Sequence, residues 1–298
     1  MNIRYEDNRE FNNCILNKDI MVEMRDGTRL ATDIYLPDSD NLESPNISPT
    51  LLHRTPYGKS SGERPDEAKF FTEHGYVVVI QDCRGRYHSE GGFTKYTDEG
   101  NDGYDTLAWI GRQGWSNGQI GSYGLSYAAH TQAAMASLNP QNLTCMWLDC
   151  GGFSNAFISG CRNNGAFELR QLTWAFREAL ESFLVQNDPK TLSEMNTVDP
   201  KELFLDLPWG PNDSPLRWAP DYEKYLLDIW EEERFTDYWK QIGLSIESHL
   251  KHFSDIPQMH LGGWYDTYSK STTDNYVQLS ETKKGPIQLI MGPWTHGG

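Results

Sequence analysis

Ser126 lies in a segment whose residues predict a strand, a tight turn and the start of a helix. Residues 120–129 read IGSYGLSYAA, and the alanine-rich stretch that follows favours a helix ended by Asn139-Pro140. The turn needs small neighbours, which Gly124 and Ala128 supply, so the motif is G-x-S-x-A, close to the stricter G-x-S-x-G. A serine at such an apex is exposed above a sheet, where its hydroxyl can attack a carbonyl carbon. Ser126 is therefore the candidate nucleophile.

A serine nucleophile needs a histidine base and an acid that orients the histidine. Asp266 follows a predicted strand over 258–262, and His296 follows another over 286–291. This chain order of serine, acid and histidine is typical of nucleophiles at a strand-to-helix turn. Asp149, at the end of a predicted strand over 143–148, is a rival acid. His130 is a poorer candidate base, because it falls within the helix after the turn.

The oxyanion of a tetrahedral intermediate needs two hydrogen-bond donors. The first candidate is the backbone N–H of Tyr127, which directly follows the nucleophile. The second is expected in the loop over 54–59, where the Tyr57 hydroxyl is the natural donor. Trp264 and Trp294, each two residues before a proposed catalytic residue, are candidates for the wall of the substrate pocket.

The elements that must position these residues alternate between strands and helices. A hairpin is predicted around Asp26-Gly27, with further strands over 49–54, 76–82, 120–125 and 143–148. Helices are predicted over 67–74, 102–111 and 127–138 between them. Alternation of this kind predicts an α/β protein with a doubly wound, mostly parallel sheet. From about residue 153 the spacing becomes helical, so we expect core segments over 1–152 and 256–298 and an inserted helical cap over 153–255.

Several segments together resemble the CocE/NonD family of serine hydrolases, which includes cocaine esterase, α-amino acid ester hydrolases and the catalytic domain of Xaa-Pro dipeptidyl-peptidases. The matching segments are RTPY (54–57), DCRG (82–85), SEG (89–91), DGYDTLAWI (102–110), WSNG (115–118), GLSY (124–127), GGWYD (262–266) and GPWTH (292–296). The resemblance implies an α/β-hydrolase fold with a helical cap and the same catalytic and oxyanion residues. Members usually continue into a jelly-roll domain that helps to wall the site, and the resemblance implies that this sequence lacks it.

The amino-acid composition limits the classes of partner and substrate that we expect. The formal net charge is −16, which disfavours nucleic acid and anionic membranes and favours small neutral or cationic substrates. The first ten residues lack the apolar core of a signal peptide, and the longest aliphatic run, VVVI, is too short to span a bilayer, so we expect a cytoplasmic protein. Homo-oligomerisation is left open.

No metal or organic cofactor is expected. The five cysteines form no C-x-x-C pair, which argues against structural zinc and against a disulfide framework. Asp82 and Arg84 could be taken for part of a metal or thiol site, but we interpret them as a structural ion pair. The acidic run over 231–233 is interpreted as a solvated helix face rather than as a site for a substrate amine.

These residues predict hydrolysis of an ester, amide or short peptide through an acyl-enzyme intermediate. An Xaa-Pro dipeptidyl-peptidase is the alternative within the same chemistry, and it would need a carboxylate for the amino terminus of the substrate. A truncated, non-catalytic remnant of such a hydrolase is the alternative from another functional class.

Overall fold

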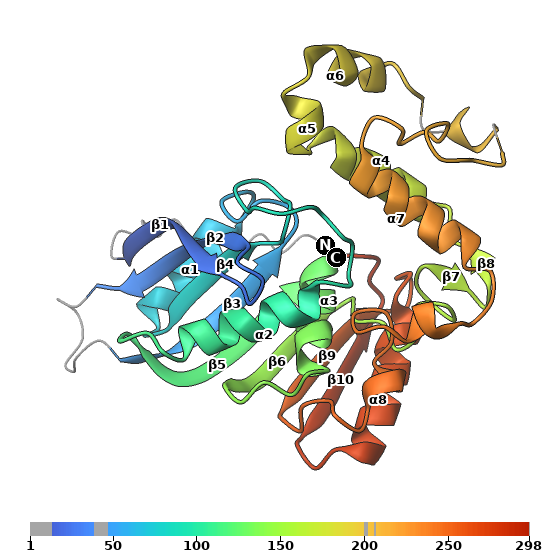
Figure 1. Ribbon diagram of the computed structural model, residues 1–298. Helices are drawn as coiled ribbons and strands as arrows, with labels where there is room; N and C mark the ends of the chain where they lie inside the picture. Colours follow the sequence, from blue (N-terminus) through green and yellow to red (C-terminus); the bar gives the residue numbers. More distant parts are fainter. Residues whose placement is uncertain (1–13, 39–46, 200–201, 206, 298) are drawn as a thin grey trace.

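The computed structural model describes residues 14–38, 47–199, 202–205 and 207–297. These residues build an eight-stranded sheet in the order β1-β2-β4-β3-β5-β6-β9-β10 (Figure 1). Its strands are β1 (Cys14–Glu23), β2 (Arg29–Pro37), β3 (Ser48–Thr55), β4 (Val77–Asp82), β5 (Ser116–Leu125), β6 (Leu143–Asp149), β9 (Gln258–Gly263) and β10 (Ile287–Gly292). The β1–β2 and β2–β4 pairs are antiparallel, and all other neighbours are parallel. The predicted mostly parallel sheet and its opening hairpin are confirmed.

Helices cover both faces of this sheet. They are α1 (Arg64–Glu73), α2 (Glu99–Ile110), α3 (Tyr127–Ala136) and α8 (Ser269–Thr282). Side chains alternate between the two faces of a strand, so Val78 and Ile80 of β4 pack in the cluster that contains α1. Val77 and Val79 point the other way, into the cluster formed with α2, α3 and Leu279 of α8. β4 is therefore buried on both faces, as its continuous apolar sequence predicts.

The chain between β6 and β9 is mainly helical. It contains β7 (Arg162–Asn163), β8 (Ala166–Phe167), α4 (Arg170–Leu180), α5 (Phe183–Gln186), α6 (Pro189–Asn196), η2 (Glu202–Phe204), α7 (Pro220–Glu231), η3 (Asp237–Lys240) and η4 (Glu247–His249). α4 and α7 lie side by side beyond the carboxyl ends of the parallel strands (Figure 1). The short β7–β8 ribbon was not predicted, and the division of the chain at residues 153 and 255 stays a prediction.

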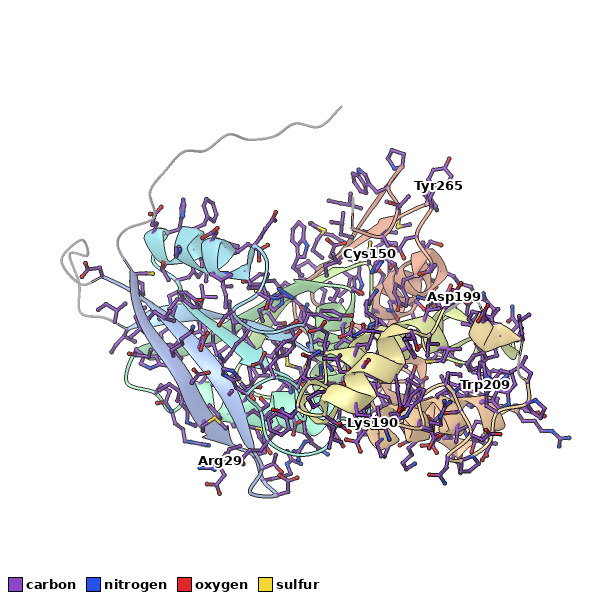
Figure 2. All side chains as sticks on the ribbon, turned by 90° about the horizontal axis from the view of Figure 1, so that it is seen from above. Arg29, Cys150, Lys190, Asp199, Trp209 and Tyr265 are labelled. Carbon is purple, nitrogen blue, oxygen red and sulfur yellow. The ribbon has the colours of Figure 1, made fainter. Side chains whose placement is uncertain are left out.

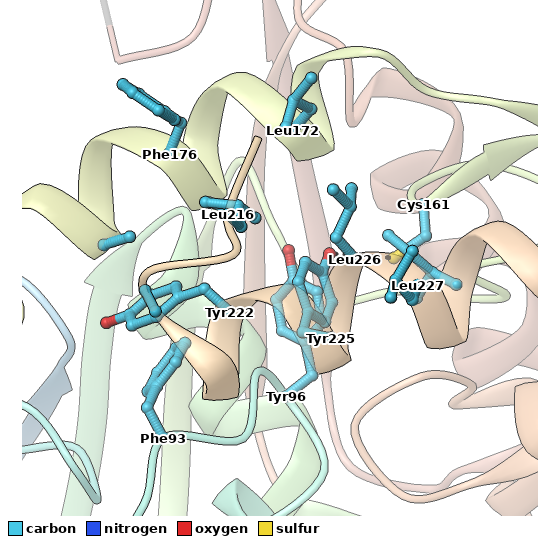
Figure 3. Close-up of a cluster of buried hydrophobic side chains, with 14 of the residues drawn as sticks. Phe93, Tyr96, Cys161, Leu172, Phe176, Leu216, Tyr222, Tyr225, Leu226 and Leu227 are labelled. Atoms are coloured by element: carbon cyan, nitrogen blue, oxygen red, sulfur yellow. Dashed lines mark hydrogen bonds between the residues drawn. The ribbon is translucent and has the colours of Figure 1, made fainter. Parts of the chain in front are cut away.

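A large hydrophobic cluster joins this helical region to the sheet. Phe93 and Tyr96, from the loop before α2, pack against Tyr222 and Tyr225 of α7 (Figure 3). The ring centroids of Phe93 and Tyr222 are 5.2 Å apart and nearly stacked. Aromatic side chains bury much apolar area with little loss of side-chain entropy, so this cluster fixes α7 and α4 above the strand ends.

Buried charged side chains form an ion pair at the carboxyl end of β3. Arg54 at the end of β3 forms an ion pair of 2.8 Å with Glu99, and the Glu99 carboxylate also accepts a hydrogen bond of 3.0 Å from the Tyr127 hydroxyl. The predicted pairing of Asp82 with Arg84 is wrong. Arg84 instead binds Asp102 at 2.6 Å and Asp26, because the chain turns its guanidinium toward the start of α2 rather than back toward β4.

No helix in the described residues combines the length and apolarity needed to cross a bilayer.

Candidate functional site

Ser126 is the single residue that connects the end of β5 to the start of α3. Its φ of 60° and ψ of −116° lie outside the regions that non-glycine residues normally adopt. Strain of this kind costs about 1–3 kcal/mol and persists only where the surrounding structure enforces it. The unusual conformation lifts the serine off the ends of both elements, which is what the sequence motif predicts for a nucleophile.

Two glycines make this turn sterically allowed. A Cβ atom on Gly124, whose φ is 146°, would lie 2.4 Å from the Cβ of Ala128. A Cβ atom on Gly151, in the loop after β6, would lie 2.5 Å from the carbonyl oxygen of Ser126. The Ala128 methyl thus fits because residue 124 has no side chain, which explains how alanine replaces the second glycine of the stricter motif.

Asp266 and His296 meet above the ends of β9 and β10. The Asp266 Oδ2 and His296 Nδ1 atoms are 2.7 Å apart, and the carboxylate is buried while the imidazole is 41% exposed. Burial alone would raise the pKa of Asp266. Hydrogen bonds from His296, the Tyr268 amide and the Cys150 thiol outweigh burial and hold this pKa below its ordinary value. Asp266 is therefore ionised at neutral pH and fixes Nδ1 of His296 as the hydrogen-bond donor.

Backbone hydrogen bonds tie the loops that carry these two residues. The Trp264 amide donates to the Gly292 carbonyl at 2.9 Å, and the Tyr265 amide donates to the Trp294 carbonyl at 3.1 Å. Gly263 has no side chain where a Cβ atom would lie 2.2 Å from that same Trp294 carbonyl oxygen. The distance between acid and histidine is thus set by backbone contacts as well as by their own bond.

Cys150, Asp266 and His296 offer ligand-type atoms that all lie within 4.8 Å of one another. Metal binding would require a thiolate. Burial raises the pKa of the Cys150 thiol well above its usual range, and the neighbouring Asp149 and Asp266 carboxylates raise it further. Cys150 is therefore a thiol that donates to carboxylates, and this trio fits a hydrogen-bond chain better than a metal site.

Asp149, the rival acid, ends β6 beside this chain. Burial raises its pKa, and its side chain accepts a hydrogen bond from Cys150. Its backbone carbonyl accepts from the Ser126 amide at 2.8 Å. Among the described contacts of His296, the carboxylate at bonding distance belongs to Asp266 and not to Asp149.

Tyr57 and Tyr127 place two donors near the serine. Tyr127 is the first residue of α3, so its backbone N–H has no acceptor within the helix. The Tyr57 hydroxyl oxygen accepts a hydrogen bond of 3.0 Å from the Trp174 indole of α4. In that bond the hydroxyl oxygen is the acceptor, so the hydroxyl proton is not used by it and can donate elsewhere. Burial raises the pKa of Tyr57, so this proton is retained at neutral pH.

These residues converge on one cavity of about 390 Å³, which we call the Ser126 cavity. Tyr57, Ser126, Tyr127 and His296 all line it. The structure thus brings together the predicted nucleophile, base and oxyanion donors, and Asp266 reaches them through His296. Helix α4 supplies part of the opposite wall, including Trp174.

Trp264 and Trp294 do not line the Ser126 cavity. Their side chains are 61% and 40% exposed, and neighbouring Tyr265 projects at the outer edge of the molecule (Figure 2). Their role as pocket residues stays a prediction.

Sequence reasoning did not assign Lys95, Arg170 or Tyr268 to the cavity wall. No sequence motif or spacing indicates that these side chains line the cavity. Lys95 lies in a loop and Arg170 begins α4, so only the fold brings them to the serine.

A family model described as X-Pro dipeptidyl-peptidase (S15 family) matches residues 26–298. Cocaine esterase of Rhodococcus sp. (strain MB1 Bresler) is 28% identical over 297 residues, which cover 95% of this chain and 49% of the esterase. The chain thus spans about half the length of the curated relatives it matches.

Solved structures give the same answer for the fold. An α-amino acid ester hydrolase is 22% identical with a TM-score of 0.66, covering 96% of this chain and 49% of its own. A CocE/NonD family hydrolase from Staphylococcus aureus is 22% identical with a TM-score of 0.67, covering 93% and 46%. These similarities confirm the predicted α/β-hydrolase fold.

The crowding at the serine turn leads to a stability prediction. We expect Gly124→Ala to lower the free energy of unfolding by about 2–4 kcal/mol, because it adds backbone strain to an overpacked contact with Ala128. Gly114→Ala is the matched control, because a Cβ atom there meets nothing within 4 Å. Urea denaturation followed by circular dichroism measures both. Equal stability of the two variants would contradict the tight turn.

Proposed function

The chain belongs to the X-Pro dipeptidyl-peptidase (S15) family, and from that premise we propose that it is a serine hydrolase that cleaves an ester or amide bond through an acyl-enzyme intermediate. The observation that carries this proposal is the 2.7 Å bond between Asp266 and His296 beside a cavity that Ser126 also lines. The small-residue turn at Ser126 supports the same proposal.

The first half-reaction acylates the serine. Asp266 holds the proton of His296 on Nδ1, which leaves the Nε2 lone pair free to accept the Ser126 proton. The serine oxygen attacks the carbonyl carbon, and the carbonyl oxygen becomes an oxyanion. The Tyr127 amide and the Tyr57 hydroxyl donate to that oxyanion. His296 then gives its new proton to the leaving group, and the tetrahedral intermediate collapses to the acyl-enzyme.

The second half-reaction uses water in place of the serine. His296 takes a proton from water, the hydroxide attacks the acyl carbonyl carbon, and the same donors bind the second oxyanion. The proton returns to Ser126 as the acid product leaves. All proton transfers pass through His296, so no metal or organic cofactor takes part in this proposal.

The nucleophile and the acid can each be tested by substitution. We expect a fluorophosphonate probe to label the wild type and not Ser126→Ala. We expect Asp266→Asn to lower kcat on a p-nitrophenyl ester by about 10,000-fold, because the histidine tautomer is no longer fixed. Asp149→Asn is the matched control and should lower kcat far less. No labelling of a folded wild type would favour a non-catalytic remnant, and a greater loss in Asp149→Asn would make Asp149 the acid.

The Tyr57 hydroxyl provides a separate test. Tyr57→Phe keeps the ring but removes the donor, so we expect kcat to fall by about 100- to 1,000-fold while the fluorophosphonate still labels Ser126. Tyr87→Phe, at an exposed tyrosine outside the Ser126 cavity, is the control. An unchanged kcat in Tyr57→Phe would remove Tyr57 from the oxyanion site.

The alternative substrate class, favoured by the family description, is an Xaa-Pro peptide. Such a substrate presents an α-ammonium group, yet no described residue that lines the Ser126 cavity is acidic. We therefore expect p-nitrophenyl esters to be cleaved with a higher kcat/KM than Xaa-Pro-p-nitroanilides. Parallel spectrophotometric assays compare the two, and a reversed order would make dipeptidyl-peptidase activity the better proposal.

A further inference from the structure

The charge around the Ser126 cavity is opposite in sign to the charge of the whole chain. The chain carries a formal net charge of −16. Among the described residues that line the cavity, however, the lysine and arginine side chains are Lys95, Arg170 and Arg177, and no aspartate or glutamate is present. Local charges dominate once a ligand has left bulk water, because the dielectric constant falls and screening by salt weakens. The cavity is thus suited to an anion, although the composition favours neutral or cationic substrates.

We propose that the substrate is an ester or amide that carries a carboxylate, and that Lys95 binds this carboxylate. This inference rests on the proposed hydrolase function and names its substrate class.

The two arginines of the cavity already have carboxylate partners. The Arg170 Nε atom lies 3.4 Å from Glu168, and the Arg177 Nε atom lies 3.1 Å from Glu178. Glu178 also binds the buried Arg86 at 2.8 Å, so two cations share one carboxylate. The arginines therefore add positive potential to the cavity without offering a fully unpaired cation.

Lys95 differs from them because it is buried and no ion pair to it is found among the described residues. Its Nζ atom donates to the Gln171 Oε1 atom at 3.0 Å and lies 3.5 Å from the centroid of the Trp174 ring. The same amide oxygen also accepts from the Tyr225 hydroxyl, so it is shared. Burial lowers the pKa of Lys95 well below its ordinary value. A carboxylate that enters beside the amine opposes this effect of burial, because a nearby negative charge favours the protonated ammonium. The ammonium then donates a charge-assisted hydrogen bond, which is about twice as strong as a neutral one.

His130 supplies a second unused donor in the same wall. Its Nδ1 atom accepts a hydrogen bond of 3.1 Å from the Gly152 amide, which places the ring proton on Nε2. That Nε2 atom is buried and has no hydrogen-bond partner. The His130 ring packs 4.9 Å from the Tyr96 ring, which Lys95 also contacts. An unsatisfied buried donor is costly, and a ligand oxygen would satisfy it.

The carboxylates of α7 lie in a different place. Asp221, Asp228 and Glu231 of α7, with Glu232 directly after it, line a second cavity, which neither Ser126 nor His296 lines but which shares Lys95 with the Ser126 cavity. Helix α7 turns Tyr222 and Tyr225 toward the aromatic cluster that contains Tyr96 (Figure 3). These acidic side chains thus lie away from the nucleophile, and among the described residues none of them forms an ion pair with Lys95, so the amine still lacks a carboxylate partner.

The test compares matched esters that differ in one charge. The acyl-side pair is mono(4-nitrophenyl) adipate and its neutral methyl ester, and the leaving-group pair is 3-acetoxybenzoate and its methyl ester. We expect the wild type to have a higher kcat/KM for the carboxylate member of at least one pair, and the pair identifies the side of the scissile bond that Lys95 faces. We expect Lys95→Met to lower that preference by about 10- to 100-fold, which corresponds to one charged hydrogen bond.

Lys190→Met is the control, because Lys190 is exposed on α6, lines no part of the Ser126 cavity and should leave the preference unchanged (Figure 2). No preference in the wild type for either carboxylate, or the same preference in Lys95→Met, would overturn the inference. Failure of the hydrolase proposal is recognised separately by absent fluorophosphonate labelling. In that case, calorimetric titration with adipate still tests the carboxylate site at Lys95. We expect the wild type to bind adipate at least tenfold more tightly than Lys95→Met, and equal affinities would reject the site.

Discussion

Three stretches of backbone meet at Ser126 with no room for a Cβ atom between them. The end of β5, the first turn of α3 and the loop after β6 approach so closely that Gly124 and Gly151 cannot carry side chains. This close approach holds Ser126 in its strained conformation, and it also keeps the first amide of α3, the proposed oxyanion donor, next to the serine in the chain. The hydrophobic layers on both sides of the sheet supply the stabilisation that offsets this strain.

The second constraint joins two loops that are distant in sequence. Asp266 and His296 are separated by 30 residues, yet each directly follows one of two adjacent parallel strands. Their meeting follows from the register of β9 against β10 and from the backbone bonds between residues 264–265 and 292–294. The acid and the histidine are thus positioned by sheet geometry, and the low pKa of Asp266 is a result of that position.

The sequence could predict what depends on strand ends and local turns. The opening hairpin, the serine turn and the pairing partner of His296 are features of this kind, because a short motif or the end of an apolar run marks each of them. The order of the strands in the sheet was not predicted, since no local motif fixes which strands become neighbours. Trp174 and Lys95 could not be predicted in the same way. Trp174 reaches Tyr57 from 117 residues away, and only the packing of α4 against the aromatic cluster brings it there.

Net charge is a second example of what the sequence alone cannot predict about the site. Net charge describes the whole surface, and the expectation that nucleic acid is disfavoured as a partner rests on it alone and stays a prediction. It carries no information on which side chains line a cavity, and the described lining of the Ser126 cavity is basic in an acidic protein. The pairing of Arg84 is a similar case, since the sequence places Asp82 nearby but the fold directs the guanidinium toward Asp26 and Asp102.

The bond between the Trp174 indole and the Tyr57 hydroxyl has a consequence for how such a protein can change during evolution. Helix α4 forms part of the wall of the Ser126 cavity and also holds the hydroxyl of Tyr57, the proposed oxyanion donor, so a substitution that shifts α4 changes both features at once. Under the proposed function, adaptation to a bulkier substrate through this helix is therefore coupled to reaction rate, whereas changes in loops remote from Trp174 can tune recognition independently.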